Sequence, residues 1–312
     1  MLAVIRLVIN KLTEERGSIA TLSIFALTAL MGFSALVIDV GVLYLNRVEL
    51  VNLSDAAVLA GVRDLPGDII AAQASAEAYA RDNGKPNDRI KIDIIDNRYI
   101  IIDAVRSVDL FFARVFGYNT VDVRAQAAAA IKPVSGIAKI VPWGIEWKSF
   151  QYGVSYRLKE GGGSGYSGNY GALALGGTGA KVYEKNIMDG YNGIIRTGDW
   201  ITTEPGNMSG KTQNGVAYRI AQDPNATFST VKEGSPRIVV VPVVESLEVH
   251  GRSDVKVVGF AGFFLEGCGG SGNKNYVEGR FMQMVVPNAE VSESASSYGL
   301  YSSSLIPLSE VE

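Results

Sequence analysis

An uncharged apolar run at residues 17–38 constrains this chain more than any other feature. As a helix that rises about 1.5 Å per residue, the run is long enough to cross the ~30 Å hydrocarbon layer of a bilayer. A core helix of a soluble protein normally carries charged residues on its outer face. We therefore predict a transmembrane helix at residues 17–45, preceded by a cytoplasmic N-terminal segment at residues 1–16.

Basic residues set the expected orientation. Arg6, Lys11 and Arg16 precede the run, and basic flanks stay on the cytoplasmic side of a membrane. The first twelve residues read either as an amphipathic helix on the inner leaflet or as a plain leader. A cleaved secretory signal is the alternative to an anchor, but its apolar core is normally about 7–15 residues. Because apolar residues continue at helical spacing to Val62, we predict an unbroken single-pass helix with the C-terminal bulk outside.

Composition excludes several classes of function. A net charge of −3 supplies no concentrated basic face, so we expect no nucleic-acid partner. The one cysteine, Cys268, and the one histidine, His250, exclude an intramolecular disulfide and a two-histidine metal site. Four acidic residues in Gly-rich segments lack the spacing of a calcium loop: Asp189, Asp199, Glu204 and Glu266. We predict no catalytic, cofactor-binding or metal site, and hence no enzyme.

Residues 46–132 predict an α+β module next to the membrane. A helix is expected from Asp68 to residue 83, followed by a hairpin of two alternating strands around the turn Asp96-Asn97. Residues 110–117 place apolar side chains on one face of a second helix, with Ser107 as a cap and Gly117 as its end. The small-residue stretch 120–131 predicts a returning strand that completes a sheet against the long N-terminal helix.

Residues 16–131 resemble the TadG-like Flp pilus-assembly family. The resemblance rests on Arg16-Gly17, the apolar run, and the segments VIDVGVLYLNRVELVNLSDAAVLAGV, LFFARVFG and VDVRAQAAAAI. It implies a pilin-like N-terminal region whose helix anchors the chain in the bacterial cytoplasmic membrane and packs among neighbouring helices. The implied partners are other Tad/Flp pilus components or inner-membrane platform proteins. Most of the specificity lies in Asp39, Gly41, Leu43, Tyr44, Asp55, Ala56, Ala57, Leu59, Ala60 and Gly61.

Processing is one point at which the chain departs from that family. Relatives that prepilin peptidase cleaves after a glycine carry a glutamate five residues into the mature chain. Cleavage between Gly17 and Ser18 would place Leu22 at that position. The departure favours a retained membrane-bound assembly or anchoring factor over a polymerised subunit.

Three residues of the apolar helix are candidates for helix pairing in the membrane. Asp39 stands at the end of the run, where an acid pairs with a partner's cation or N-terminus, or remains solvated at the interface. Gly32 and Ala35 are small enough to allow close approach of a second helix, although two intervening residues do not give the small-xxx-small spacing.

Residues 133–289 predict a β-rich extracytoplasmic domain, either a sandwich or barrel-like. Short apolar strands alternate with Gly- and Pro-rich turns, and Pro242 inside residues 237–244 predicts a bulge or edge position. Five aromatic residues are expected in the core: Trp143, Trp147, Phe260, Phe263 and Phe264. Residues 290–312 are serine-rich and predict a flexible tail.

Two segments in this domain suggest phosphate binding without completing a motif. Residues 163–168 fit G-x-G-x-x-G but no suitable helix follows, and Gly210-Lys211-Thr212 resembles the end of a P-loop. Pro205 stands where that loop needs its first glycine, and the following residues 213–220 suggest a strand. We interpret both segments as structural loops.

Two hypotheses of function follow. In the first, the chain is a non-catalytic membrane-anchored accessory component, minor pilin-like or for assembly and anchoring, of a Tad/Flp-type pilus system. In the second, the N-terminal helix only tethers a surface module, and residues 133–289 bind a cell-envelope polymer or surface ligand.

Overall fold

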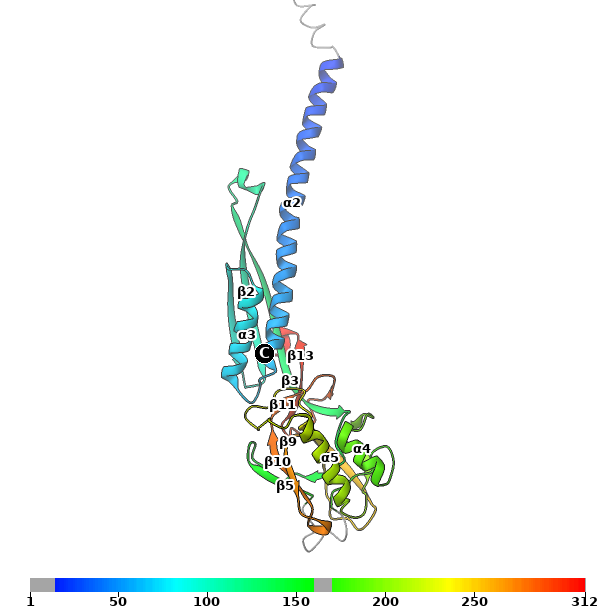
Figure 1. Ribbon diagram of the computed structural model, residues 1–312. Helices are drawn as coiled ribbons and strands as arrows, with labels where there is room; N and C mark the ends of the chain where they lie inside the picture. Colours follow the sequence, from blue (N-terminus) through cyan, green and yellow to red (C-terminus); the bar gives the residue numbers. More distant parts are fainter. Residues whose placement is uncertain (1–14, 160–169, 312) are drawn as a thin grey trace, which may run out of the picture. The chain divides into compact units, whose positions relative to one another are not determined.

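The computed structural model describes residues 15–159 and 170–311 (Figure 1). The chain divides into two compact units. The first holds residues up to Ala57 together with Glu77–Ile92 and Ile102–Ala127. The second holds Val58–Ala76, Asp93–Ile101 and the chain from Ala128 onward. Predicted segment 1–16 lies almost entirely outside the described residues.

The first element is one unbroken helix, α2 (Glu15–Val62), 48 residues long. It confirms the prediction that the helix continues unbroken from the uncharged run to Val62. The second helix, α3 (Ile69–Asn83), is also as predicted. Its first turn is capped by Asp68, whose Oδ1 accepts a hydrogen bond from the Ala71 N–H at 2.9 Å, and such a cap fixes where a helix begins.

A seven-stranded sheet has the order β1-β2-β3-β13-β11, with β12 and β6 also pairing with β3. The predicted β1–β2 hairpin is confirmed, and Asp96 and Asn97 both have positive φ (52° and 54°), the geometry of a two-residue hairpin turn. The strands are β1 (Asp88–Ile95), β2 (Tyr99–Asp109), β3 (Thr120–Ile137), β6 (Ile195–Arg196), β11 (Met284–Val285), β12 (Glu290–Val291) and β13 (Leu300–Ile306).

The predicted helix at residues 110–117 is mostly wrong. Strand β2 continues to Asp109 and includes Ser107, so only one 3-10 turn, η1 (Ala113–Phe116), remains. The N–H of Leu110 donates to the carbonyl of Asn119, so the loop closes too tightly for a longer helix. Gly117 does end the turn, with φ 89°.

The C-terminal segment differs from the predicted flexible tail. Strand β13 pairs antiparallel with β3, from Tyr301 opposite Pro133 to Ile306 opposite Ala128. The hydroxyl of the buried Ser302 donates to the Val286 carbonyl at 2.7 Å, which satisfies a polar group that would otherwise be costly to bury. Strand β3 also passes without a break through residues 132 and 133, where we placed a domain division.

A six-stranded sheet has the order β4-β8-β9-β10-β5, with β7 also pairing with β9. Pro242 lies in β8, between two neighbouring strands, and the register of β8 and β9 shifts just after it, between Val243 and Val244. Trp143, Phe260, Phe263 and Phe264 are buried as predicted, and Trp147 is partly buried. The strands are β4 (Ile145–Glu146), β5 (Ser155–Leu158), β7 (Trp200–Thr202), β8 (Ile238–Val244), β9 (Asp254–Gly269) and β10 (Tyr276–Met282).

Two helices pack beside this sheet, α4 (Ala180–Asp189) and α5 (Ser209–Gln222). The strand predicted at 213–220 is wrong, because these residues lie in α5. The buried positions Thr212, Gly215, Val216 and Arg219 recur at helical spacing. Two short 3-10 turns, η2 (Gly272–Lys274) and η3 (Leu308–Glu310), complete the described chain. An α+β chain that begins with a long apolar helix and continues into a β-rich region is thereby confirmed.

Candidate functional site

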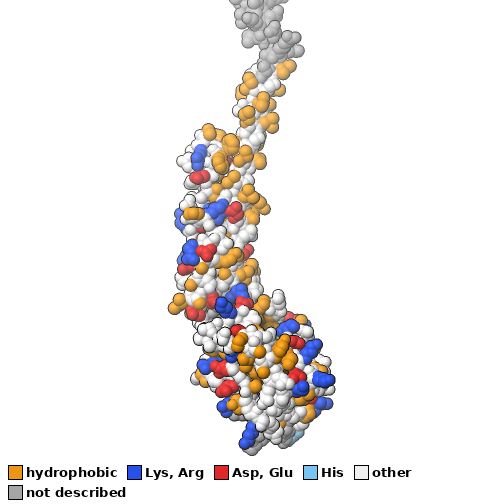
Figure 2. Space-filling view, viewed as in Figure 1, with side chains coloured by type: hydrophobic (Ala, Val, Ile, Leu, Met, Phe, Trp, Pro, Cys, Tyr) orange, Lys and Arg blue, Asp and Glu red, His pale blue; other side chains and the backbone are white. Residues whose placement is uncertain are grey.

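The N-terminal part of α2 presents apolar side chains that the chain itself leaves uncovered. Within the described residues, Thr21–Val62 is the one helix segment long and apolar enough to cross a membrane, and its most apolar window is not buried at all. Figure 2 shows these side chains along the helix. The large exposed ones include Ile19, Leu22, Ile24, Phe25, Leu27, Leu30, Met31, Phe33, Leu36 and Val37.

The predicted processing and pairing residues all lie on α2. Gly17 and Ser18 fall in its first turn. Gly32, Ala35 and Asp39 recur three and four residues apart and therefore share one face of the helix. A Cβ built on Gly32 would meet no atom within 4 Å, so the chain leaves open space at this position. Pairing of this face with another helix, and cleavage after Gly17, remain predictions.

Asp39 itself is buried, with 4% of its surface exposed, and is not the solvated interfacial acid considered above. Its carboxylate accepts hydrogen bonds from three consecutive backbone N–H groups: Phe111 (2.8 Å), Phe112 (3.0 Å) and Ala113 (2.7 Å). These N–H groups stand at the start of η1, where no carbonyl precedes them in the turn. Asp39 therefore caps η1 from another element, and joins α2 to the connection between β2 and β3.

A cluster of charged residues joins α2 to the sheet further along the same unit. Arg106 on β2 forms two hydrogen bonds with Asp88 on β1, at 2.6 and 2.7 Å. A third bond, at 2.7 Å, goes to Glu49 on α2, which also accepts from Lys85 at 2.6 Å. Hydrogen bonds from Lys85 and Arg106 lower the pKa of Glu49. Glu49, Asp88 and Arg106 are therefore charged at neutral pH, and each is paired within the cluster.

Sequence reasoning missed this cluster, although a signal was present. The inward positions of β2 recur every second residue as Ile100, Ile102, Ala104, Arg106 and Val108, and all five are buried. An arginine at an inward position needs an acidic partner. That partner, Asp88, lies in the neighbouring strand β1. It could not be identified before the pairing of β1 with β2 was known.

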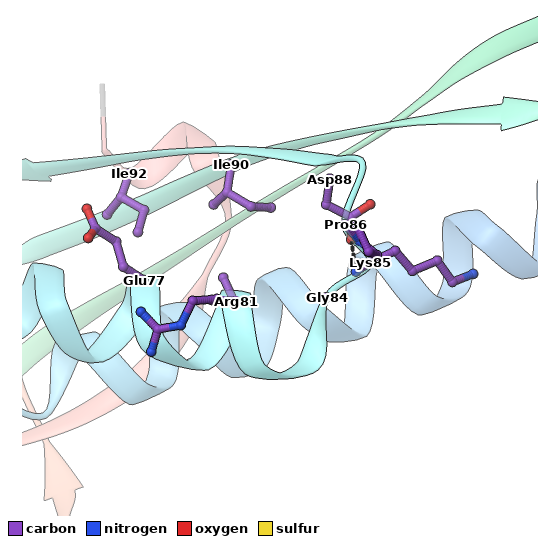
Figure 3. A pocket seen from close by; sticks show the side chains of 9 residues that line it. Glu77, Arg81, Gly84, Lys85, Pro86, Asp88, Ile90 and Ile92 are labelled. Atoms are coloured by element: carbon purple, nitrogen blue, oxygen red, sulfur yellow. Dashed lines mark hydrogen bonds between the residues drawn. The ribbon is translucent and has the colours of Figure 1, made fainter.

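A shallow groove of about 450 Å³ lies between α3 and β1 (Figure 3). Glu77 and Arg81 extend from α3 on one side, and Ile90 and Ile92 from β1 on the other. At its end the Lys85 N–H donates to Asp88 Oδ2 at 2.8 Å. Because the Asp88 carboxylate is already bound by Arg106, the groove offers no free nucleophile or base at this point.

The P-loop-like residues Lys211 and Thr212 are paired with other side chains of the chain. Lys211 pairs with Glu184 at 2.8 Å, and the Thr212 hydroxyl is buried against Lys159 at 2.8 Å. Residues 163–168 lie outside the described part of the chain. Within the described residues 15–159 and 170–311, no three His, Cys, Asp or Glu side chains lie close enough to hold a metal ion.

Comparison with known families adds one match. The model of the Tad family, described as "Putative Flp pilus-assembly TadE/G-like", matches residues 17–64. No curated protein and no solved structure matches the chain. The matched residues coincide with the exposed apolar helix and with Asp39. Residues 17–64 of this chain are therefore similar to the TadE/G-like Flp pilus-assembly family.

Proposed function

We propose that the chain is a non-catalytic, membrane-anchored accessory component of a Tad/Flp-type pilus system. One observation carries the proposal: the residues that match the family form a helix whose apolar surface the chain leaves bare. Such a surface is stable in a bilayer or against other apolar helices, and not in water.

The contacts of the first unit support a structural role. The polar groups that are buried beside α2 bind one another or the backbone, as in Asp39 with η1 and Arg106 with Asp88. Functional sites usually leave such groups available to a ligand. These contacts thus fix the position of α2 against the strands of the first unit.

We further propose that the N-terminus faces the cytoplasm and the residues after α2 face the outside. The basic residues before the helix support this orientation, since they resist transfer across the membrane. Partners are then reached through the membrane helix, and residues 133–289 are presented outside the cell membrane.

The helix face is tested by Gly32→Leu in the full-length chain. Leucine preserves the apolar character of the span and fills the space that a close-packed partner helix would occupy. We expect carbonate-resistant membrane retention to persist and co-purification with other Tad components to fall. Val37→Leu, on another face of α2, is the matched control and should leave co-purification unchanged. Equal co-purification of both variants would contradict helix pairing at this face.

Anchoring itself is tested by Ala29→Arg, because an arginine near the centre of a span costs about 3 kcal/mol on insertion scales. We expect loss of membrane retention, whereas Ala74→Arg on the exposed surface of α3 should be retained. Retention of the Ala29→Arg chain at the wild-type level would contradict the transmembrane assignment. Binding of the full-length chain to purified envelope polymer, unchanged by Gly32→Leu, would favour the tethered-module hypothesis.

A further inference from the structure

The connection between β2 and β3 ends in an apolar tip formed by residues 110–118. Nine residues, LFFARVFGY, contain one charged side chain, Arg114, which pairs with Asp109 at 3.3 Å. Five of its side chains point away from the chain: Val115 and Phe116 are 83% and 80% exposed, and Phe111, Phe112 and Tyr118 are exposed as well, whereas Leu110 is buried. Contiguous exposed apolar side chains of this size mark a binding surface in a soluble region.

The three hydrogen bonds of Asp39 fix this tip beside α2. Figure 1 shows the turn between β2 and β3 alongside the helix, and Figure 2 shows apolar side chains gathered at its end. Residue 39 lies 22 residues beyond Gly17, or about 33 Å along a helix. The tip is therefore held at the outer end of the apolar span, close to where a ~30 Å hydrocarbon layer ends.

Capping also buries a charged side chain that would otherwise stand exposed on α2. Between residues 17 and 46, Asp39 is the one charged side chain, and it is buried beneath the tip. Val40, Tyr44 and Leu45 continue the exposed apolar surface of α2 as far as Arg47. The apolar surface of the helix thus extends past the level of the tip on the side away from the N-terminus.

We propose that residues 110–118 insert into the outer leaflet of the membrane that α2 crosses, as a second, interfacial contact with lipid. Phenylalanine and tyrosine side chains favour the headgroup boundary, where an apolar ring meets a polar surface. The Arg114 side chain is half-exposed in its pair with Asp109, and the charged end of such a side chain can reach lipid phosphates from an apolar surface. A second contact beside the helix restricts the tilt of α2 in the membrane and its rotation about its own axis. The Gly32 face of α2 is thereby kept directed to one side. The inference rests on the proposed anchoring by α2.

The test uses the full-length chain in phosphatidylcholine liposomes, in a Cys268→Ser background. Single cysteines at Val115, Ala29 and Asp82 carry an environment-sensitive fluorophore, and quenching is measured with brominated lipids and with aqueous iodide. We expect the label at Val115 to be blue-shifted, quenched by lipid brominated near the headgroup, and protected from iodide. The label at Asp82, an exposed residue of α3, should be quenched by iodide alone.

The label at Ala29 separates the two proposals. Lipid quenching at Ala29 together with iodide quenching at Val115 would overturn the membrane-inserted tip and leave the anchor intact. Absence of lipid quenching at Ala29 would overturn both. Protection of Val115 from lipid and from iodide would show that protein covers the tip, a second copy or another subunit, and would also overturn the proposal.

Discussion

Arg106 and Asp88 form a buried bidentate ion pair across β1 and β2. Two bonds join the guanidinium to the carboxylate, at 2.6 and 2.7 Å, and the side chains are 5% and 3% exposed. Removing one partner of such a pair leaves an uncompensated buried charge. The pair therefore holds β1 and β2 of the first unit together.

We expect Asp88→Ala to lower the free energy of unfolding by about 3 kcal/mol, because Arg106 loses its buried carboxylate partner and retains the exposed Glu49 and a 3.3 Å hydrogen bond to the Asn46 amide oxygen. Thermal unfolding in detergent, followed by circular dichroism, measures the loss. Asp122→Ala breaks the exposed pair with Arg89 and should cost less than about 1 kcal/mol. Similar losses in both variants would show that burial of the Arg106 pair has no energetic consequence.

The same pair predicts a loss of stability in acid. Burial by itself raises the pKa of Asp88, but hydrogen bonds from Arg106 and from the Lys85 N–H outweigh it and hold the pKa below its ordinary 3.8. The unfolded chain then binds more protons, so this stabilisation is present above about pH 4 and is lost as the pH falls through the folded pKa. Asp88→Asn should have a flatter profile between pH 5 and 2, and a profile as steep as the wild type would contradict the assignment.

Asp39→Ala should free the tip from α2, because three backbone N–H groups lose their acceptor and each unmade bond costs about 1 kcal/mol. The expected result is faster tryptic cleavage after Arg114 in detergent. Asp109→Ala removes only the exposed pair with Arg114 and serves as the control. A cleavage rate in Asp39→Ala no faster than in Asp109→Ala would contradict the capping role.

Gly61→Ala should destabilise the contact between α2 and α3. A Cβ at this position would lie 2.6 Å from the Ala72 carbonyl oxygen and 2.9 Å from the Ala76 Cβ. Overpacking of this kind costs about 1–3 kcal/mol, more than the ~1 kcal/mol that alanine gains over glycine in a helix. Gly41→Ala is the matched control on α2, with no atom within 4 Å, and should not lower the melting temperature. Equal melting temperatures would contradict close approach at Gly61.

Lys159 predicts stability that increases toward alkaline pH. Burial lowers the pKa of its ammonium from 10.5 to about 7, while its Nζ donates to the Asn207 carbonyl and the Thr212 hydroxyl. Because the unfolded chain binds the extra proton between these two values, stability rises as the pH goes from 7 to 10. Lys159→Met should lose that rise, whereas Lys211→Met, which breaks a partly exposed pair, should keep it. A rise that survives in Lys159→Met would show that another group causes it.

Local patterns predicted most of the elements between residues 15 and 109. The uncharged run predicted α2, the Asp68 start predicted α3, and Asp96-Asn97 predicted the β1–β2 turn, since each depends on the residues' own conformational preferences. The helix at residues 110–117 and the strand at 213–220 were wrong. In both segments apolar residues allow either element, and contacts distant in sequence decided between them: Asp39 with η1, and Ile187 with Gly215 in α5.

By itself, the sequence determined that this chain carries a continuous apolar helix, similar to the Tad family, that leads into an α+β region. Length, absence of charge and helical spacing are properties of consecutive residues and need no partner. Only the tertiary structure decided that Asp39 caps η1, that Arg106 is paired beneath the sheet, and that residues 300–306 form β13 against β3. Each of these joins residues far apart in the chain, and the energy of burying a charge or pairing a strand depends on a neighbour that no local pattern identifies.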